Sequence, residues 1–197
     1  TFINDYYTRN GISKGLKECL DNDIILISDV DEFPDIDKFK LFNGNLTVFK
    51  QVMFYFKLNL RVRNFDHDSG DGLWPGTRML NFKLFKKIND VQKIRNFKAK
   101  KYGWWRLDKP RLNIINYGGW HFRFFGSSKN LKHELENRSI GRGENILSTY
   151  SESDINNIIK NRLPFTTEEE RYEVYPLSKM PDFVKLNKER YSDSLII

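Results

Sequence analysis

The pattern of apolar and polar positions predicts a helix that leads directly into a buried strand. Apolar residues recur at helical spacing between Thr1 and Leu20, and an acidic turn follows them. Residues 24–28 are an almost unbroken run of branched apolar residues, and Pro34 stops the segment that follows. A short run of this kind is typical of a strand buried on both faces, as in a parallel sheet. We therefore expect an α/β protein in which 24–28 is a central strand.

The rest of the chain predicts more strands first and mostly helices later. The stretch 46–63 is apolar on both faces in its first half and alternates between polar and apolar residues in its second half. Residues 112–117 predict another strand, which ends at a pair of glycines. Later helices are expected at 129–137, after a capping box at 151–154, and around 183–186. No linker or repeat divides the chain, so one domain covering 1–197 is the prediction.

Three carboxylates follow the first strand directly, in the order Asp29, Asp31 and Glu32. Like charges placed side by side repel and raise one another's pKa, and a bound divalent cation removes that cost. Ligands also gather at the carboxyl ends of strands in open α/β sheets, so one interpretation is a metal site for a phosphorylated ligand. The other is an ordinary solvated strand end, because Asp-x-Asp occurs four times here and Asp commonly caps turns. Residue types alone leave both open.

Composition narrows the classes of protein that are possible. The 197 residues are 39% hydrophobic and 15% aromatic, which indicates a folded globular chain and excludes a disordered one. The net charge of +7 fits an attraction for anionic substrates or a solvated basic face, and nucleic-acid binding is the disfavoured alternative. The single cysteine, Cys19, excludes an internal disulfide and is expected to be a small core residue. No apolar run approaches the ~20 residues of a transmembrane helix.

Aromatic and histidine residues add further candidates. Trp74, in a Trp-Pro-Gly turn, is either an exposed stacking platform for a ligand or a plug that fixes its loop to the core. Trp104 and Trp105 form a second aromatic loop. His121 follows the glycine pair at a strand end, which favours a ligand role, whereas His67, between Asp66 and Asp68, is interpreted as part of a loop.

Two widely separated stretches together resemble glycosyltransferase family 17. They are Asp23–Pro34, which contains Ser-Asp-Val-Asp-Glu-Phe-Pro, and Gly118–Phe122, which is Gly-Gly-Trp-His-Phe. The preceding segment, Arg9-Asn10-x-Ile12-x-x-Gly15-Leu16, and the ending from Leu177 to Tyr191 are also similar to the family pattern. The family includes the β-1,4-mannosyl-glycoprotein N-acetylglucosaminyltransferases. The resemblance covers the chain from about Arg9 to its tail.

This resemblance implies a GT-A-like nucleotide-diphospho-sugar transferase fold, with a mixed central sheet flanked by helices. The family's N-terminal βα units would lie upstream of Thr1, so the chain is expected to be a fragment of the domain. The implied reaction is an inverting transfer of a sugar, N-acetylglucosamine in the known members, from a UDP-sugar donor to a glycan hydroxyl with Mn²⁺ or Mg²⁺. Asp29, Asp31 and His121 would bind the metal or the donor. Arg9 and Lys132 would contact phosphate, the alternative being that both are ordinary charges on helix surfaces, and Trp74 would line the donor site.

An inverting transfer also needs a base that accepts the acceptor hydroxyl's proton. The candidates are Glu32, Glu134, Glu136 and Glu144, of which Glu32 and Glu144 are preferred. Glu32 is the easiest to place beside the metal, and the alternative interpretation of Glu32 is a cap or a salt-bridge partner. Family members continue after Gly-Trp-His with serine or cysteine and later carry His-x-Glu. This chain instead has Arg123 and then Arg142-Gly143-Glu144, which leaves the base unassigned.

Two other functions compete with the transferase. A metal-dependent phosphoryl or nucleotidyl transferase, or a hydrolase, would use the same carboxylates, and a non-catalytic carbohydrate-binding module would use the basic and aromatic loops. The Lys-, Asn- and Ile-rich composition is typical of a microbial or viral cytoplasmic enzyme, so cytoplasmic localisation is expected. A eukaryotic member with an upstream anchor would lie in the Golgi lumen. The sequence carries no signal for an oligomeric state.

Overall fold

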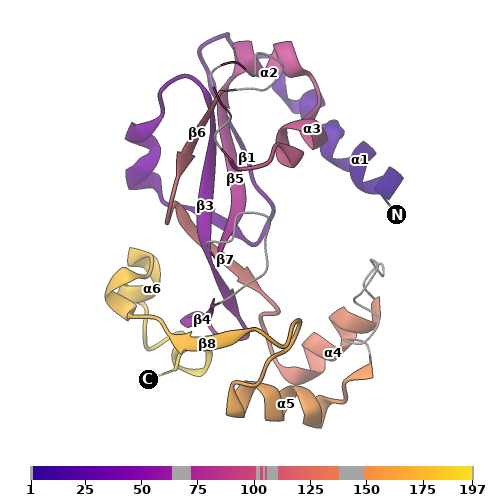
Figure 1. The fold of residues 1–197 in the computed structure, drawn as a ribbon, viewed down its shortest axis with the longest axis vertical. Coiled ribbons are helices and arrows are strands. Elements are labelled where there is room, and N and C mark those ends of the chain that lie inside the picture. The colour runs from indigo at the N-terminus through magenta and orange to yellow at the C-terminus, as the bar shows by residue number, and fades with distance from the viewer. Residues whose placement is uncertain are drawn as a thin grey trace. The chain divides into compact units, whose positions relative to one another are not determined.

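The chain is a mixed α/β protein with a mixed sheet flanked by helices, seen in the computed structural model in Figure 1. The structure describes residues 2–63, 72–100, 103, 105, 111–137 and 149–196. Contacts divide the chain into two compact units, Thr1–Gln51 with Trp74–Trp120 and Val52–Leu73 with His121–Ile197. The predicted mixed sheet with flanking helices is confirmed, while the GT-A assignment and the single domain stay predictions.

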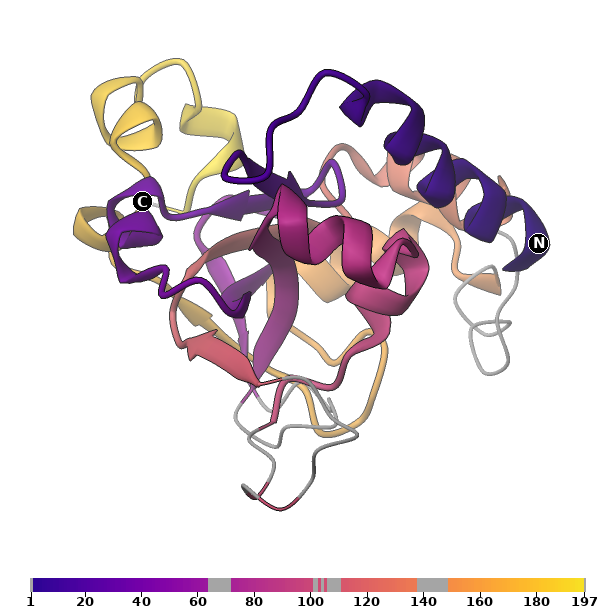
Figure 2. The same ribbon diagram turned by 90° about the horizontal axis from the view of Figure 1, so that it is seen from above.

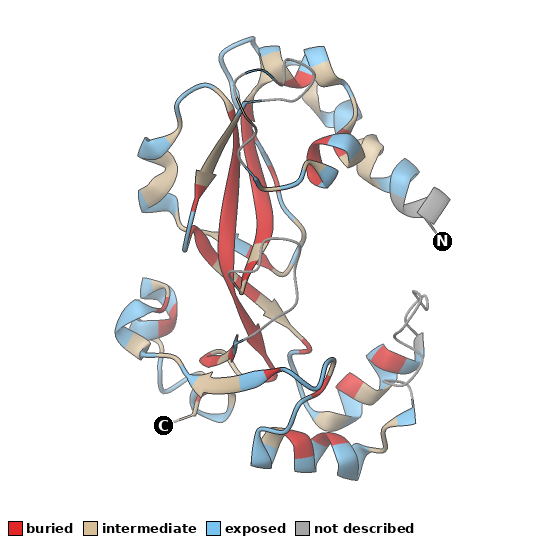
Figure 3. Ribbon diagram, viewed as in Figure 1, coloured by how far each residue is buried: buried red, intermediate tan, exposed pale blue. Residues whose placement is uncertain are grey.

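The first unit contains the sheet that carries the acidic stretch. Its strands are β1 (Ile24–Ile27), β2 (Glu32–Pro34), β5 (Leu73–Asn81, except Leu73) and β6 (Leu112–Ile115), while β3 (Leu46–Tyr55) and β7 (Gly119–Arg123) are divided between the two units. β1 runs antiparallel to β5, β5 lies next to β3, and β6 is parallel to β3. β2 pairs with β7. Figure 3 shows β3 and β5 buried along most of their lengths, which makes them the centre of this unit.

β1 differs from the strand predicted at 24–28. Among the described residues, β5 is its one strand partner, and the pairing is antiparallel, so the expectation of a strand buried on both faces of a parallel sheet is wrong. Ile25 and Ile27 are 6% and 3% exposed and face the core, whereas Ile24 and Leu26 are 42% and 41% exposed. An edge strand with one covered face explains this alternation, which its all-apolar sequence hides.

Helices cover the face of β1 that bears Ile25 and Ile27. These two side chains pack in one core cluster with Phe85, Val91 and Ile94. The cluster residues come from α2 (Phe82–Ile88) and α3 (Val91–Asn96), and α1 (Phe2–Asn10) lies beside α3 in Figures 1 and 2. Between α1 and β1, the predicted helix continues as a 3-10 turn, η1 (Gly11–Leu16), and Cys19 packs against the same core, as predicted.

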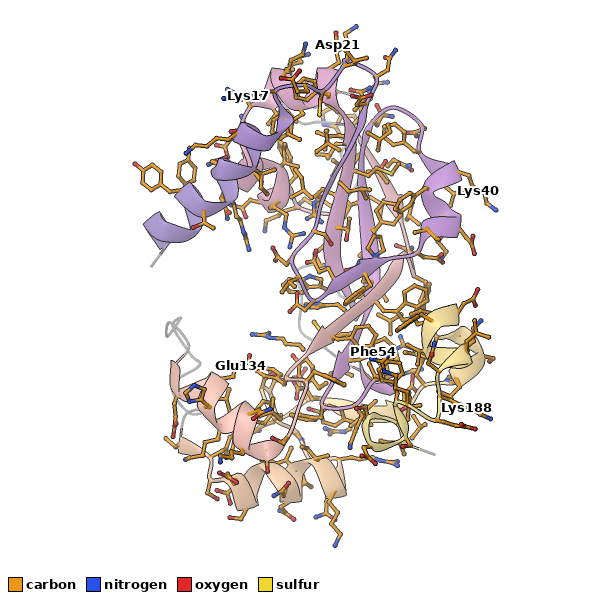
Figure 4. All side chains as sticks on the ribbon, turned by 180° about the vertical axis from the view of Figure 1, so that it is seen from behind. Lys17, Asp21, Lys40, Phe54, Glu134 and Lys188 are labelled. Carbon is orange, nitrogen blue, oxygen red and sulfur yellow. The ribbon has the colours of Figure 1, made fainter. Side chains whose placement is uncertain are left out.

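Polar side chains fix the ends of these helices. Asn81 caps α2 by accepting a hydrogen bond from the Leu84 amide at 2.8 Å, and Asp90 caps α3 in the same way with Lys93 at 2.8 Å. Figure 4 labels Lys17 and Asp21 at the same end of the unit, where Asp21 forms an ion pair with Lys86 of α2. On the other face of the sheet, η2 (Ile36–Leu41) brings Phe39 against Phe49 and Met79. Both faces of the central strands are thereby covered.

The second unit combines two strands with the C-terminal helices. Its elements are β4 (Leu60–Arg63), α4 (Ser128–Asn137), α5 (Glu152–Asn161), β8 (Arg171–Val174), η4 (Leu177–Lys179), α6 (Asp182–Leu186) and η5 (Ser192–Ser194). β4 lies between the end of β3 and β8, antiparallel to both. The predicted capping box at the start of α5 is confirmed, because the Asp154 amide donates to Ser151 Oγ and the Ser151 amide donates to Asp154 Oδ2.

Aromatic rings fill the core of the second unit. Phe165 lies 5.1 Å from Phe56 and 5.0 Å from Phe124, measured between ring centroids, and Phe124 lies 4.9 Å from Tyr55. These edge-to-face contacts are the preferred geometry for aromatic pairs. These aromatic residues therefore form core and not a ligand platform.

A buried carboxyl group, that of Glu170, lies at the edge of these rings. Glu170 Oε2 accepts hydrogen bonds from the Phe165 and Thr166 amides at 2.9 and 3.0 Å and from the Tyr172 hydroxyl at 2.9 Å. Burial, together with the Glu170 charge, raises the pKa of Tyr172 above its ordinary value, so the hydroxyl stays protonated and donates. These bonds tie the segment after α5 to β8.

Replacing Tyr172 with phenylalanine is expected to lower the free energy of unfolding by about 1–2 kcal/mol, because Glu170 loses one of its buried donors. Urea denaturation measures the difference. Tyr150→Phe is the matched control, since its ring stacks on Phe165 and no hydrogen bond of its hydroxyl is seen within the described residues. Equal losses in the two variants would contradict a specific role for the Tyr172–Glu170 bond.

Candidate functional site

The acidic stretch forms a tight turn between β1 and β2. The Glu32 amide donates to the Asp29 carbonyl at 3.1 Å, which closes the turn around an exposed Val30. Ser28 Oγ donates to the Glu32 carbonyl at 2.9 Å and lies 2.7 Å from the Thr77 hydroxyl of β5. The carboxylates therefore stand at the carboxyl end of a strand, as the sequence predicts. Hydrogen bonds to the neighbouring strand fix the turn.

Arg95 of α3 is the residue around which these carboxylates are arranged. Its Nη2 donates to Glu32 Oε1 at 2.7 Å and to Asp29 Oδ2 at 2.8 Å. Its Nη1 donates to Glu32 Oε2 and to the Gly76 carbonyl, both at 2.8 Å. The side chain is only 6% exposed, and that of Glu32 is 0% exposed. Arg95 thus joins α3, the β1–β2 turn and β5 through one buried, bidentate ion pair.

The electrostatics of Arg95 follow from this setting. Burial alone would lower the pKa of Arg95, but the hydrogen bonds and charge of Glu32, with the charges of Asp29 and Asp31, raise the pKa above its ordinary value. The guanidinium therefore stays charged throughout the physiological range. Asp31, which is half-buried, belongs to the same electrostatic group although it is not part of the bidentate pair.

A second buried arginine, Arg78 of β5, lies beside the first. Its guanidinium donates to the carbonyls of Pro75 at 2.6 Å, Gly76, and Arg95 at 2.9 Å. Burial, together with the charge of Arg95, lowers the pKa of Arg78 to about 9, which still leaves it charged at neutral pH. Backbone carbonyls thus accept the hydrogen bonds of Arg78, and carboxylates accept those of Arg95. These partners offset the cost of burying two positive charges next to each other.

Arg9, at the end of α1, reaches the same turn from the surface. Its Nη2 lies 3.2 and 3.3 Å from the two oxygens of Asp29, and its Nη1 donates to Gln92 Oε1 at 3.0 Å. Both Arg9 and Asp29 are about one-third exposed. The sequence predicts a phosphate contact for Arg9, and the structure places it against the predicted metal ligand Asp29.

Trp74 lies against this ion-pair cluster. Its indole Nε1 donates to Glu32 Oε1 at 2.7 Å, and the side chain is half-buried. This contact supports the plug interpretation, because the indole N–H fixes the start of β5 to the β1–β2 turn. Position 76 has no room for a larger side chain beside this cluster, because an added Cβ at Gly76 would lie 1.9 Å from Gln51 Oε1.

The preferred base, Glu32, does not have the surroundings that a base needs. A base must reach the proton of a bound acceptor, and both Glu32 oxygens already accept hydrogen bonds in a fully buried position. The structure therefore supports the alternative interpretation, in which Glu32 is a salt-bridge partner, and that partner is Arg95. Glu134, labelled in Figure 4, and Glu136 are exposed on α4 of the second unit, and Glu136 pairs with Lys132 at 3.3 Å.

The remaining candidates lie in the second unit or outside the described residues. His121 is buried in β7 within the second unit, whereas Asp29 and Asp31 lie in the first, so a metal site shared by all three stays a prediction. The phosphate contact of Lys132 also stays a prediction. Glu144, Trp104 and the His67 loop with Asp66 and Asp68 fall outside the described residues.

The donor set fits a metal that a substrate helps to bind. Within the described part of the chain, no group of three or more His, Cys, Asp or Glu residues is placed to hold a metal ion by itself. Mg²⁺ and similar hard cations are usually bound by one or two carboxylates together with substrate phosphates. Asp31 and Asp29 are the residues that could supply such a set, although both oxygens of Asp29 accept hydrogen bonds from arginines in this structure, and the metal stays a prediction.

Comparisons with protein-family models, with curated proteins and with solved structures find no match to this chain. None of the helices that the structure describes is both long enough and apolar enough to cross a membrane. The family resemblance therefore rests on the residues quoted for it.

Sequence reasoning missed Arg95 and Arg78. A signal for Arg95 does exist, because it shares the helical phase of Val91 and Ile94, and all three are buried on the same side of α3. An arginine on an apolar helix face needs polar partners in the core, although the sequence does not say which residues they are. Arg78 could likewise be noticed as the one charged residue within the stretch 73–80.

Proposed function

We propose that the chain is a metal-dependent inverting glycosyltransferase of GT-A type that uses a UDP-sugar donor, N-acetylglucosamine being the expected sugar, and a glycan hydroxyl as acceptor. One observation carries the proposal. The Asp29–Asp31 turn stands at the carboxyl end of β1 and is held rigidly by Arg95 and by bonds to β5. Rigid placement of a minimal carboxylate set suits a metal that bridges protein and diphosphate. The resemblance of the two motifs to glycosyltransferase family 17 also supports the proposal.

The residues of the turn have separate tasks in this proposal. Asp31 would ligate the metal, and Asp29 would contribute Oδ1, the oxygen that Arg95 does not contact, to the metal or to the donor ribose. Arg95 and Glu32 do not touch substrate but hold the turn in its binding conformation. When bound, Mn²⁺ or Mg²⁺ would neutralise the charge that develops on the UDP leaving group. The base stays unassigned, with Glu134, Glu136 and Glu144 as candidates.

The distribution of charge supports an anionic ligand at the first unit. That unit contains 18 Lys and Arg residues against 11 Asp and Glu, whereas the second unit contains 15 of each. The whole net charge of +7 therefore belongs to the unit that carries the turn. Such an asymmetry raises the local concentration of anions, which a nucleoside diphosphate sugar is.

Thermal unfolding with UDP-sugars, each with and without Mn²⁺, tests the proposal. We expect UDP-N-acetylglucosamine to raise the melting temperature only when Mn²⁺ is present, by the equivalent of about 2.7 kcal/mol at a ligand concentration of 100 times Kd. Asp31→Asn should abolish this shift. Asp37→Asn is the matched control, because it belongs to another Asp-x-Asp pair of the same unit and lies exposed on η2.

Two results would contradict the transferase. If no UDP-sugar stabilises the protein with metal, the proposal loses its basis. If a glycan alone stabilises wild type and Asp31→Asn equally without metal, the result favours the function of a non-catalytic carbohydrate-binding module. Hydrolysis of a phosphate ester that depends on Asp31 and on metal would favour the phosphoryl-transfer alternative.

A further inference from the structure

Asp29 is contacted by two arginines that differ in strength and in burial. Arg95 donates to Oδ2 at 2.8 Å from a position that is 6% exposed. Arg9 lies at 3.2 and 3.3 Å and is 34% exposed. A buried, short, bidentately anchored arginine is fixed, whereas a longer and partly solvated ion pair is weak and exchangeable. Arg9 is therefore the arginine whose contact with Asp29 can break while the contact of Arg95 remains.

The charges of the cluster balance only while Arg9 is present. Three arginines, Arg9, Arg78 and Arg95, face three carboxylates, Asp29, Asp31 and Glu32. A divalent cation that enters this balanced group is repelled by three guanidinium charges and finds Asp29 occupied on both oxygens. Without Arg9 the group carries a net charge of −1, and Asp29 Oδ1 becomes available as a ligand.

Arg9 can change partner without movement of its helix. The end of α1 is fixed to α3 by Asn10, whose Oδ1 accepts the Val91 amide at 2.8 Å. The side chain alone has to rotate, and it keeps a polar neighbour in Gln92. A phosphate offers a guanidinium two strong, charge-assisted hydrogen bonds, which are better than its present long contacts to Asp29.

We infer that Arg9 is a latch that couples metal binding to diphosphate binding. In the free protein Arg9 covers Asp29 and keeps metal affinity low. When the donor binds, Arg9 moves to its phosphate oxygens, and the uncovered Asp29 joins Asp31 on the metal. This inference rests on the proposed function and extends it to the order and regulation of binding at the same site. By linkage, each ligand then tightens the other by the same factor.

Titration calorimetry measures this coupling directly. Mn²⁺ affinity is determined with and without saturating UDP, for wild type, Arg9→Gln and Arg9→Lys. In wild type we expect weak binding of Mn²⁺ alone and at least a tenfold gain with UDP. In Arg9→Gln we expect Mn²⁺ alone to bind several-fold more tightly and the gain from UDP to fall below about threefold. Arg9→Lys should lie between the two, because it keeps the charge but loses the bidentate contact.

Lys14→Gln is the control, since it removes an exposed positive charge from η1, the element that follows α1. It should leave the coupling unchanged. A coupling in Arg9→Gln equal to that of wild type, or weaker binding of Mn²⁺ alone, would overturn the latch while leaving the proposed function intact. Failure of wild type to bind Mn²⁺ or UDP in any combination would overturn both. Melting curves of all variants confirm that each is folded.

Discussion

Replacing Arg95 with methionine is expected to lower the free energy of unfolding by about 3–5 kcal/mol. The substitution keeps most of the side-chain volume but leaves Glu32, whose side chain is 0% exposed, without the partner that binds both of its oxygens. An uncompensated buried charge accounts for the size of the effect, since breaking such a pair costs far more than removing both members. Chemical denaturation of the purified protein measures the loss.

Two further variants separate the ion pair from the helix that carries it. Lys93→Met, an exposed position on α3, should change stability by no more than about 0.5 kcal/mol. The double variant Arg95→Met with Glu32→Met should recover a large part of the stability lost in Arg95→Met, because it removes the orphaned charge. A loss below about 1 kcal/mol in the single variant would show that Arg95 is not the anchor of the turn.

Replacing Gly119 with alanine is expected to cost about 3 kcal/mol or more, from strain and overlap together. Gly119 has φ +144°, and a Cβ there would lie 2.1 Å from the Phe33 carbonyl oxygen and 2.8 Å from Pro34 Cα. These are backbone atoms of β2, so relief requires β2 and β7 to separate. Because β2 follows the acidic turn directly, metal-dependent UDP binding should weaken in parallel.

Gly15→Ala provides the control for Gly119→Ala. An added Cβ at Gly15 meets nothing within 4 Å, and we expect a change between zero and a gain of about 1 kcal/mol. Thermal melting compares the two variants. Similar melting temperatures for Gly119→Ala and wild type would mean that the close approach of β2 and β7 is not required.

Local features of the fold could be predicted because they depend on near neighbours in the chain. The capping box at Ser151 follows from local backbone requirements, and the structure confirms it. The place of 24–27 in the sheet could not be predicted, because an all-apolar run suits a central strand as well as an edge strand. Its antiparallel partner, β5, begins some 45 residues later, and nothing local specifies that pairing.

In the candidate site, too, the local features could be predicted and the long-range contacts could not. The turn of carboxylates after an apolar strand could be found from the sequence alone. The partners of Glu32 could not, since they are Arg95 and Trp74, which are 63 and 42 residues away. Buried ion pairs are long-range choices of partner, and one sequence does not reveal which arginine meets which acid. The relation of His121 to the turn stays a prediction, because His121 belongs to the second unit and the turn to the first.

The backbone groups at the edge of β1 could pair with a strand of another molecule, and the net charge of the first unit opposes that pairing. The Asp23 carbonyl accepts the Phe82 amide at 2.8 Å, so the antiparallel register turns the backbone N–H and C=O groups of Ile24 and Leu26 away from β5. An apolar edge of this kind is a template for strand addition between molecules. The +7 charge of the same unit opposes such self-association by mutual repulsion. Salt screens this repulsion, because the Debye length falls to about 3 Å at 1 M salt. Self-association of the protein is therefore expected to increase with ionic strength.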